Sequence, residues 1–241
     1  MFGNVLLIGG NGQLGSCLKK NDKFFKLKSP SKKKLDLTKK KNIEIALKKY
    51  APKMIINCAA ITDMKIAEKY PAKCFEVNVV GTINLVNEIK KYDKNIRLIH
   101  LSSDGVYPSI KGNYSEKSIT GPYNLYCWSK FLSEIPVKTL KKFVIIRTRF
   151  FDKNNIKFKK VAKDIFTSSI EINDLSKKIL KLLKNNFTGI INIGTKRRSL
   201  FDRYKKYKKI NPIYRSEILA NLDIQLAKDS SMNIKKMQKL L

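Results

Sequence analysis

The sequence contains few of the residues that most often bind metals. It has one histidine, His100, and four cysteines, Cys17, Cys58, Cys74 and Cys127, whose spacing matches no metal-binding motif. We therefore expect no metal site, and we expect reduced thiols, as is usual in the cytoplasm. His100 lies within an apolar run, which predicts a packed core residue rather than a catalytic acid.

Long apolar runs are also missing. No stretch approaches the ~18 consecutive apolar residues of a membrane-spanning helix. No basic region with a cleavage site precedes the first apolar run at residues 5–8. These absences predict a cytoplasmic protein without a signal peptide or a membrane partner. The hydrophobic fraction of 43% in 241 residues is enough for one large α/β domain, or for a domain and a small lobe.

Acidic residues are scarce. There are 19 of them against 51 lysines and arginines, which gives a formal net charge of +32. Because the lysines are spread along the whole chain and form no separate basic arm, we interpret them as solvated surfaces. We expect weak attraction to polyanions at low salt, and no specific nucleic-acid partner, since no nucleic-acid-binding motif is present.

What the chain does contain is a glycine-rich turn after its first apolar run. Gly9, Gly12 and Gly15 follow residues 5–8 and open a helix-like segment. Glycines at this spacing allow a tight turn, a close approach of the backbone to a pyrophosphate, and close packing of the helix on the strand. The phosphates then lie at the helix N-terminus, where unpaired N–H groups favour negative charge. The residues expected to contact the cofactor here are Gly9, Asn11, Gly12, Gln13 and Leu14.

Apolar segments alternate with amphipathic ones along most of the chain. Strands are predicted at 5–8, 24–28, 54–57, 97–102, 143–147 and 189–193, and helices at 13–20, 42–50, 71–92, 124–134 and 173–183. This alternation predicts a Rossmann-type α/β fold with a doubly wound parallel sheet. We expect residues 1–150, completed by about 171–194, to form the dinucleotide-binding domain. Residues 151–170 and 195–241 would form a small C-terminal substrate lobe.

Tyr126 and Lys130 form a Tyr-x-x-x-Lys pair that shares one face of a predicted helix. A neighbouring ammonium would lower the pKa of the phenol and let it exchange a proton near neutral pH. Ser103 stands at the carboxyl end of the preceding strand, where ligands bind in such sheets. The alternative is that Tyr126 is simply a half-buried helix residue. The same spacing recurs in Tyr107/Lys111 and Tyr204/Lys208, which lack this context.

These motifs together resemble the extended short-chain dehydrogenase/reductase superfamily, and within it the dTDP-4-dehydrorhamnose reductases. The matching segments are 9–15, 35–38, 52–60, 62–63, 67–68, 77–78, 81, 84–85, 98–104, 126, 129–130, 147–148 and 229–233. The resemblance implies hydride transfer from a nicotinamide to the C4 ketone of a nucleotide-linked deoxysugar. Ser103, Tyr126 and Lys130 would be catalytic, with Tyr126 as proton donor and Lys130 also holding the ribose. Further cofactor contacts are implied for Asp36, Leu37, Cys58, Ala59 and Ala60.

The choice of cofactor follows from charge. No carboxylate stands in the segment 26–32, where an acidic residue would bind the 2′-hydroxyl of NAD. Lys28 and Ser29 suit a 2′-phosphate instead, so we expect NADPH, with NADH as the alternative. Asn78 would brace the loop beside the cofactor, with a simple helix side chain as the alternative, and Trp128, inside the Tyr-x-x-x-Lys helix, would be a packing residue.

The departures from the family pattern lie on the substrate side. Gly105 replaces an aromatic residue, Lys65 and Ile66 replace an Asp-Lys pair, Arg149 and Phe150 replace a small residue and a tryptophan, and the stretch before Ile172 is short. An altered sugar nucleotide is the expected substrate, bound by Thr62, Ser103, Asp104 and Arg149. An epimerase or dehydratase, a non-catalytic cofactor-binding homologue and a nucleic-acid-binding protein remain alternatives. The sequence is compatible with a homodimer.

Overall fold

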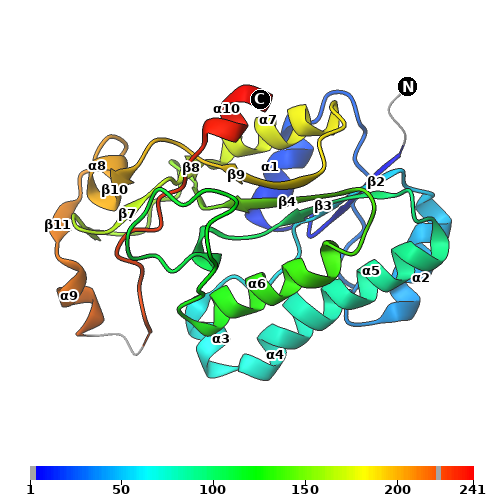
Figure 1. Ribbon diagram of the computed structural model, residues 1–241, viewed down its shortest axis with the longest axis horizontal. Coiled ribbons are helices and arrows are strands. Elements are labelled where there is room, and N and C mark those ends of the chain that lie inside the picture. The colour runs from blue at the N-terminus through cyan, green and yellow to red at the C-terminus, as the bar shows by residue number, and fades with distance from the viewer. Residues whose placement is uncertain (1–3, 221–223) are drawn as a thin grey trace.

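A computed structural model of the protein describes residues 4–220 and 224–241. A five-stranded parallel sheet forms its centre (Figure 1). Its strands follow the order β1-β2-β3-β4-β9, and every neighbouring pair is parallel. The sheet confirms the Rossmann-type α/β class. The strands are β1 (Val5–Ile8), β2 (Met54–Asn57), β3 (Arg97–Leu101), β4 (Phe143–Thr148) and β9 (Gly189–Ile193).

The prediction of a strand at residues 24–28 is wrong. Only Lys28 reaches the sheet, through a single bridge to Leu6 of β1. The carboxylate of Asp22 accepts hydrogen bonds from the backbone N–H groups of Phe24, Phe25 and Leu27 at 2.8–3.0 Å, and thereby curls the segment. Local bonds of this kind compete with the hydrogen bonds of a sheet.

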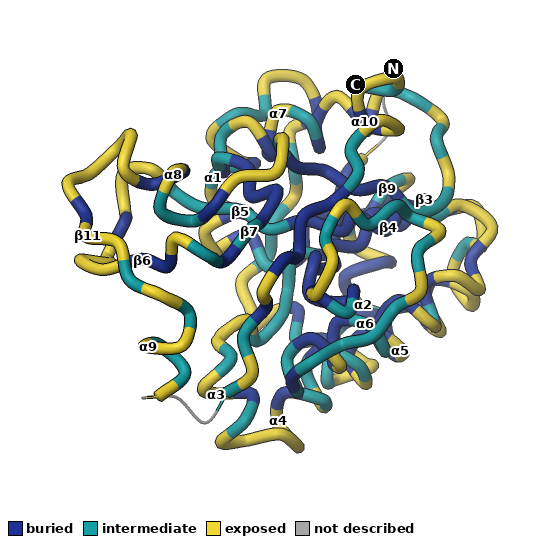
Figure 2. Tube along the Cα trace, turned by 60° about the vertical axis from the view of Figure 1, so that its left-hand side comes forward, coloured by how far each residue is buried: buried dark blue, intermediate teal, exposed yellow. Residues whose placement is uncertain are grey.

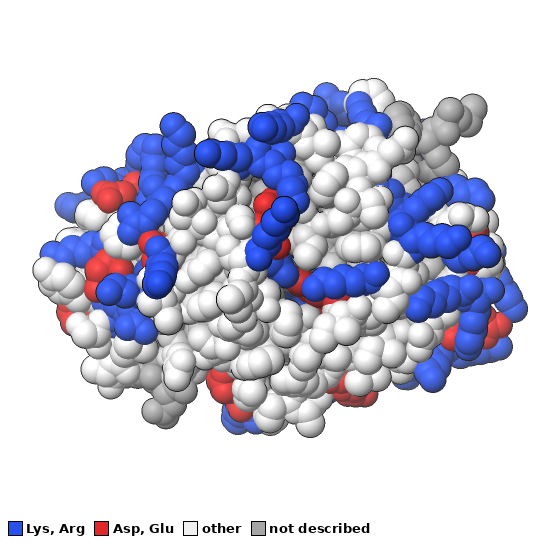
Figure 3. All heavy atoms as spheres, viewed as in Figure 1, with Lys and Arg blue, Asp and Glu red and all other residues white. Residues whose placement is uncertain are grey.

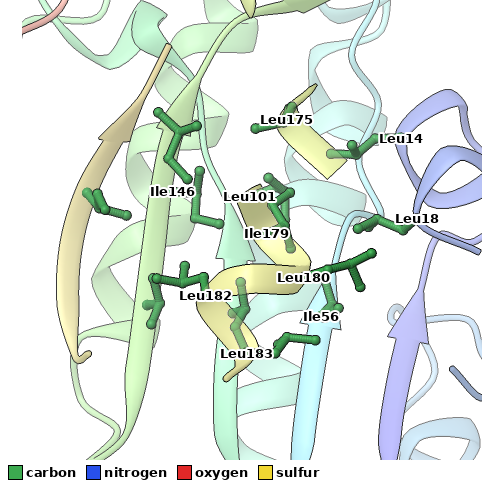
Figure 4. Packing of buried hydrophobic residues seen from close by; sticks show 14 of the residues in the cluster. Leu14, Leu18, Ile56, Leu101, Ile146, Leu175, Ile179, Leu180, Leu182 and Leu183 are labelled. Carbon is green, nitrogen blue, oxygen red and sulfur yellow. The ribbon is translucent and has the colours of Figure 1, made fainter. Parts of the chain in front are cut away.

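Helices cover both faces of the sheet (Figure 1). On one face α1 (Gln13–Asn21) packs against α7 (Ile172–Leu183), and α10 (Lys235–Leu240) packs on β9. On the other face lie α2 (Lys40–Tyr50), α5 (Gly81–Tyr92) and α6 (Leu125–Val137). Apolar side chains of α1 and α7 meet those of the strands in a closed core (Figure 4). Figure 2 shows the buried strands between exposed helix surfaces.

The segment predicted as one helix from 71 to 92 is interrupted. It consists of α4 (Pro71–Phe75), a π-helical turn η1 (Glu76–Val80) and α5, and α3 (Met64–Lys69) precedes it. Asn78 lies in the π turn. Such turns occur frequently at functional sites.

Small elements from residues 150 to 219 gather to one side of the sheet, at the left of Figure 1. They have a core of their own, made by Ile156, Val161, Tyr204 and Ile210. Residues 195–241 do not all lie there, because α10 packs on the central sheet with Met237 in its main core. The small elements are β5 (Phe150–Phe151), β6 (Lys160–Ala162), β7 (Phe166–Thr167), β8 (Ile170–Glu171), β10 (Arg198–Ser199), α8 (Leu200–Tyr204), β11 (Asn211–Ile213) and α9 (Arg215–Leu219).

Across residues 4–220 and 224–241, none of the helices combines the length and apolarity that crossing a bilayer would need. Over the same residues, no group of three or more potential metal-binding side chains comes together. The four cysteines are free thiols.

Candidate active site

The glycine-rich turn joins β1 to α1 through two close backbone approaches. Gly9 has φ +81°, and a Cβ atom there would lie 2.7 Å from the backbone nitrogen of Ala59. A Cβ atom at Gly15 would lie 2.3 Å from the carbonyl oxygen of Gly9. Both positions therefore require glycine, and they bring α1 and the loop after β2 against the turn.

Gly15 and Gly12 allow this packing to be tested. Replacing Gly15 by alanine is expected to lower the free energy of unfolding by about 1–3 kcal/mol, because the new methyl group meets backbone atoms. Gly12 is the matched control, since its Cβ would lie an ordinary 3.4 Å from the nearest atom, the Gly9 oxygen. Chemical denaturation measures both variants. Equal stability of Gly15→Ala and wild type would contradict this account of the turn.

A cavity of about 270 Å³ opens beside the turn. Its walls are formed by the end of β1, the loop after β2 and the segment around Asp36. Eight of the predicted cofactor residues line it: Gly9, Asn11, Gly12, Asp36, Leu37, Cys58, Ala59 and Ala60. Residues that the sequence analysis did not single out as cofactor contacts line it too, namely Ile8, Gly10, Pro30, Lys32, Leu35, Ile61 and Val77.

The other predicted cofactor residues lie outside that lining. Gln13 begins α1, Leu14 is buried in the core, and the backbone of Lys28 bonds to β1. Ser29 is more informative, because its hydroxyl is buried without a hydrogen-bond partner. This hydroxyl also lies close to Gly10: a Cβ atom added to Gly10 would be only 1.8 Å from it. An unpartnered buried hydroxyl beside a glycine turn fits a site for a phosphorylated ligand.

Charge at the cavity comes from Lys32 and Asp36. Burial acts to raise the pKa of Asp36, but hydrogen bonds from Thr38 and the charges of Lys32 and Lys39 outweigh it, so this pKa lies below its ordinary value. The carboxylate accepts bonds from the backbone nitrogen and the hydroxyl of Thr38 at 3.0 and 2.8 Å.

Asn78 braces the wall of the cavity, as predicted. Its Oδ1 accepts from the backbone nitrogen of Ile61 at 2.7 Å, and its Nδ2 donates to the carbonyl oxygen of Ile61 at 2.9 Å. Nδ2 also donates to the Ser129 hydroxyl at 2.8 Å. The π turn thus links the cavity wall to α6.

The structure brings Ser103 and Tyr126 together. Ser103 follows β3 and caps the short helical turn η2 (Asp104–Val106), accepting a bond from the Gly105 nitrogen at 3.0 Å. Tyr126 lies in the first turn of α6, which is capped by Asn124. The Ser103 hydroxyl lies beside the Tyr126 phenol and acts to lower its pKa.

The pKa of Tyr126 differs from the sequence expectation. Burial raises it, and the charges of Cys127 and Asp104 add to the rise, while Ser103 and Arg149 oppose it. The expectation of a lowered pKa for Tyr126 is wrong, because burial makes the net direction upward. The phenol therefore holds its proton firmly.

Lys130 is buried on the inner side of α6. Burial lowers the pKa of its ammonium to about 8, although Glu134, Cys58 and Cys74 favour the charged form. Cys58 also lines the cavity, whereas Lys130 is not part of its lining. The other two Tyr-x-x-x-Lys tyrosines lie elsewhere: Tyr107 is buried and bonded to Asn192, and Tyr204 packs on Phe151.

Asp104 and Arg149 form an ion pair next to this group, with Nε and Oδ2 2.9 Å apart. Ser230 donates to the same carboxylate at 2.7 Å, and Asp104 is only 1% exposed. Asp104 was expected to contact substrate, but its oxygens are satisfied by the protein, so it holds Arg149 in place instead. The Arg149 side chain remains 29% exposed and is therefore accessible.

Three further side chains complete the description. Tyr123, which sequence reasoning missed, lies 3.5 Å from Arg149 through its hydroxyl, and burial raises its pKa. Thr62 is exposed just before α3, outside the hydrogen-bonded group around Asp104. His100 is buried between Asn57 and Ser133, and burial holds its pKa well below the ordinary value, which confirms a neutral core residue.

Known proteins resemble this chain in sequence. A UDP-glucose 4-epimerase of Mycoplasma genitalium is 29% identical over 179 residues, which cover 61% of this chain and 52% of that protein. A dTDP-4-dehydrorhamnose reductase of Aggregatibacter actinomycetemcomitans is 32% identical over 149 residues, covering 60% of this chain and 50% of that protein. The chain spans about half the length of these curated relatives.

Solved structures match over more of their length. A dTDP-4-dehydrorhamnose reductase of Bacillus anthracis in complex with NADP superposes with a TM-score of 0.89 at 25% identity, covering 99% of this chain and 93% of that one. A protein of Sulfolobus tokodaii described as a hypothetical dTDP-4-dehydrorhamnose reductase reaches 0.83 at 26% identity, covering 99% and 94%. The family described as the RmlD substrate binding domain matches residues 3–173. With this match over most of its length, the chain belongs to the RmlD substrate binding domain family.

Proposed function

We propose that the protein is an NADPH-dependent reductase that acts on the 4-keto group of a nucleotide-linked deoxysugar. The observation that carries the proposal is that the Ser103 hydroxyl lies beside the Tyr126 phenol, at the start of the helix that also carries the buried Lys130. Relatives named dTDP-4-dehydrorhamnose reductase support this reaction class.

The chemistry of each side chain determines its role in the proposed reaction. The nicotinamide, when bound, supplies the hydride. Tyr126 donates its proton to the oxygen of the reduced ketone, and its raised pKa keeps that proton available at neutral pH. Ser103 orients the same oxygen through its hydroxyl. The Lys130 ammonium holds the ribose and contributes positive charge beside the phenol.

The cofactor would lie in the 270 Å³ cavity, with its pyrophosphate against the turn at Gly9 to Gly12. Asp36 and Leu37 would lie near the adenine, and Cys58, Ala59 and Ala60 would line the opposite wall. The unpartnered Ser29 hydroxyl, together with Lys28 and Lys32, suits the 2′-phosphate of NADPH.

Lys32 permits a direct test of cofactor preference. Reversing its charge in Lys32→Glu is expected to lower kcat/KM for NADPH about tenfold relative to NADH, because a carboxylate at the cavity repels the extra phosphate. Lys33→Glu is the matched control, since Lys33 is exposed and does not line the cavity. If both variants change the NADPH/NADH ratio equally, Lys32 has no specific role.

On the substrate side, Arg149 would bind the diphosphate of the sugar nucleotide. It is accessible and is fixed by Asp104, so a guanidinium stands next to Tyr126 in a defined orientation. Ser103 and Thr62 would add polar contacts. Residues 151–170 and 195–219 would form the lobe that closes over this substrate.

The decisive experiment offers the purified protein NADPH with a panel of dTDP- and UDP-linked 4-keto sugars, and follows the absorbance of the reduced nicotinamide. Oxidation of NADPH that depends on the presence of one sugar nucleotide supports the reductase activity. Interconversion of UDP-glucose and UDP-galactose without net use of NADPH would instead support the epimerase reaction, which the Mycoplasma genitalium relative brings into consideration. Cofactor binding without either reaction would overturn both.

The pH dependence follows from Lys130. Its pKa of about 8 means that the ammonium loses its proton just above neutral pH, so kcat/KM is expected to fall as pH rises through about 8. Lys130→Arg, which retains its charge, should shift the fall to higher pH. A wild-type profile that stays flat up to about pH 10, the ordinary range of lysine, would contradict a role for the ammonium.

A further inference from the structure

Two short segments far apart in the chain each carry lysines around an exposed aromatic ring. Residues 157–160 read Lys-Phe-Lys-Lys, and residues 205–209 read Lys-Lys-Tyr-Lys-Lys. Neither segment contains an acidic residue, and all the residues of both are exposed. The rings of Phe158 and Tyr207 are 58% and 48% exposed. Taken singly, each segment resembles the other lysine runs of this chain.

The fold brings the two segments side by side among the small elements, at the left of Figure 1. Strands β6 and β11 pair in parallel, and the backbone nitrogen of Asn211 donates to the carbonyl oxygen of Lys159 at 2.9 Å. The Nζ of Lys208 donates to the carbonyl oxygen of Ile156 at 2.7 Å. We call residues 157–160 and 205–209 the lobe-tip surface. Figure 3 shows Lys and Arg side chains gathered at this end of the molecule.

The exposed rings belong to one aromatic cluster. Phe158 stacks on Tyr204 with ring centroids 6.4 Å apart and planes 20° apart. The Tyr207 ring lies 5.7 Å from that of Phe151, which meets Tyr204 edge to face at 5.2 Å. Because Tyr204 is buried, the stacked Phe158 ring has one face covered and its other face left to solvent. The cluster therefore holds both exposed rings in place.

The positive charge of the lobe-tip surface is largely uncompensated. In residues 4–220 and 224–241, Lys205 is the only one of its seven lysines with an ion pair, to Asp202 at 2.5 Å. The other six ammonium groups create a positive field around the two rings. A ligand that matches this surface carries closely spaced negative charges together with flat apolar groups.

We propose that the lobe-tip surface binds single-stranded RNA without sequence preference. Lysines would contact the phosphates, and unpaired bases would stack on Phe158 and Tyr207, the combination by which proteins bind single strands. An acidic peptide would satisfy the lysines but leave the rings uncovered. An anionic bilayer would attract the lysines, but a ring that lies flat on Tyr204 is poorly placed to insert between lipid chains.

The test is the affinity of the full-length protein for fluorescein-labelled oligo(U) of about 12 nucleotides, measured by fluorescence anisotropy. Phe158→Leu and Tyr207→Leu should each raise Kd about tenfold, because leucine keeps the apolar packing but lacks a ring face for stacking. Phe24→Leu is the matched control. Phe24 is 68% exposed with the Lys184 ammonium 4.2 Å from its ring centre, and it lies outside the small elements. This variant should bind oligo(U) as the wild type does.

A second pair of variants tests the charge. Lys206→Gln with Lys209→Gln should lower the slope of log Kd against log salt concentration by about 1.4, since each lost phosphate contact on a single strand contributes about 0.7. Lys19→Gln with Lys20→Gln on α1 removes the same net charge and should leave the slope unchanged. Circular dichroism establishes that all variants are folded.

Three further measurements would overturn the proposal. A DNA duplex of the same length that binds as tightly as oligo(U) would show attraction by charge alone, because its bases are paired and unavailable to the rings. Displacement of oligo(U) by NADPH would place the RNA in the glycine-turn cavity. Binding to phosphatidylglycerol vesicles without binding to oligo(U) would assign the surface to a membrane. Unchanged affinity in both ring variants would also overturn it, whatever the outcome for the proposed reaction.

Discussion

Replacing Tyr126 by phenylalanine is expected to lower kcat about 10²–10⁴-fold, the usual contribution of a positioned proton donor. The substitution removes only the phenol oxygen, which lies beside the Ser103 hydroxyl in the intact site. The cavity beside the glycine turn does not include Tyr126 in its lining, so NADPH binding should change little. Turnover is measured with the sugar nucleotide identified by the panel, and binding by fluorescence of the reduced nicotinamide.

A matched control exists in Tyr214, which is 51% exposed and remote from Ser103 in the small elements. Tyr214→Phe removes the same atom and should leave kcat unchanged. Ser103→Ala should produce a smaller loss than Tyr126→Phe, because it removes an orienting group rather than the proton donor. Full turnover in Tyr126→Phe would show that the proton comes from elsewhere.

Replacing Arg147 by methionine is expected to lower the free energy of unfolding by about 3–5 kcal/mol. Arg147 and Glu134 are 2% and 0% exposed and form a two-pronged ion pair, with Nε–Oε1 at 3.0 Å and Nη2–Oε2 at 2.7 Å. Ser102 donates to the same carboxylate at 2.6 Å. Without the guanidinium, the Glu134 carboxylate would be left buried without its main partner. Chemical denaturation at neutral pH measures the loss.

The double variant Arg147→Met with Glu134→Leu separates the ion pair from simple packing. Because it removes both charges, it should recover much of the stability lost in Arg147→Met. Glu44→Ala is a control at the surface, where exposed pairs with Lys41 and Lys48 contribute little. A loss below about 1 kcal/mol in Arg147→Met would show that water reaches Glu134.

The Glu134–Arg147 pair also explains how the site is built. Glu134 lies on α6 and Arg147 on β4, so the pair fixes the helix that carries Tyr126 and Lys130 against the sheet. Activity should therefore fall in Arg147→Met together with stability, whereas Tyr126→Phe should affect activity alone.

Much of the fold could be predicted from local pattern. The central strands and the helices around them follow from the alternation of apolar and amphipathic segments, because burial on both faces of a parallel sheet demands it. The segment 24–28 was mispredicted since its apolar residues look like a strand, while the decisive interaction is a side-chain cap by Asp22. The exposure of Trp128 could not be predicted from the sequence either, because it depends on which side of α6 faces the sheet.

The sequence by itself determined the glycine turn, the Tyr126–Lys130 spacing and the position of Ser103 after a strand, because these depend on residues close together in the chain. Tertiary structure alone decided the rest. Ser230 meets Asp104 across 126 positions, and Arg149 reaches the same carboxylate across 45. The raised pKa of Tyr126 and the lowered pKa of Lys130 come from burial. Burial and long-range contacts exist only once distant segments have packed together.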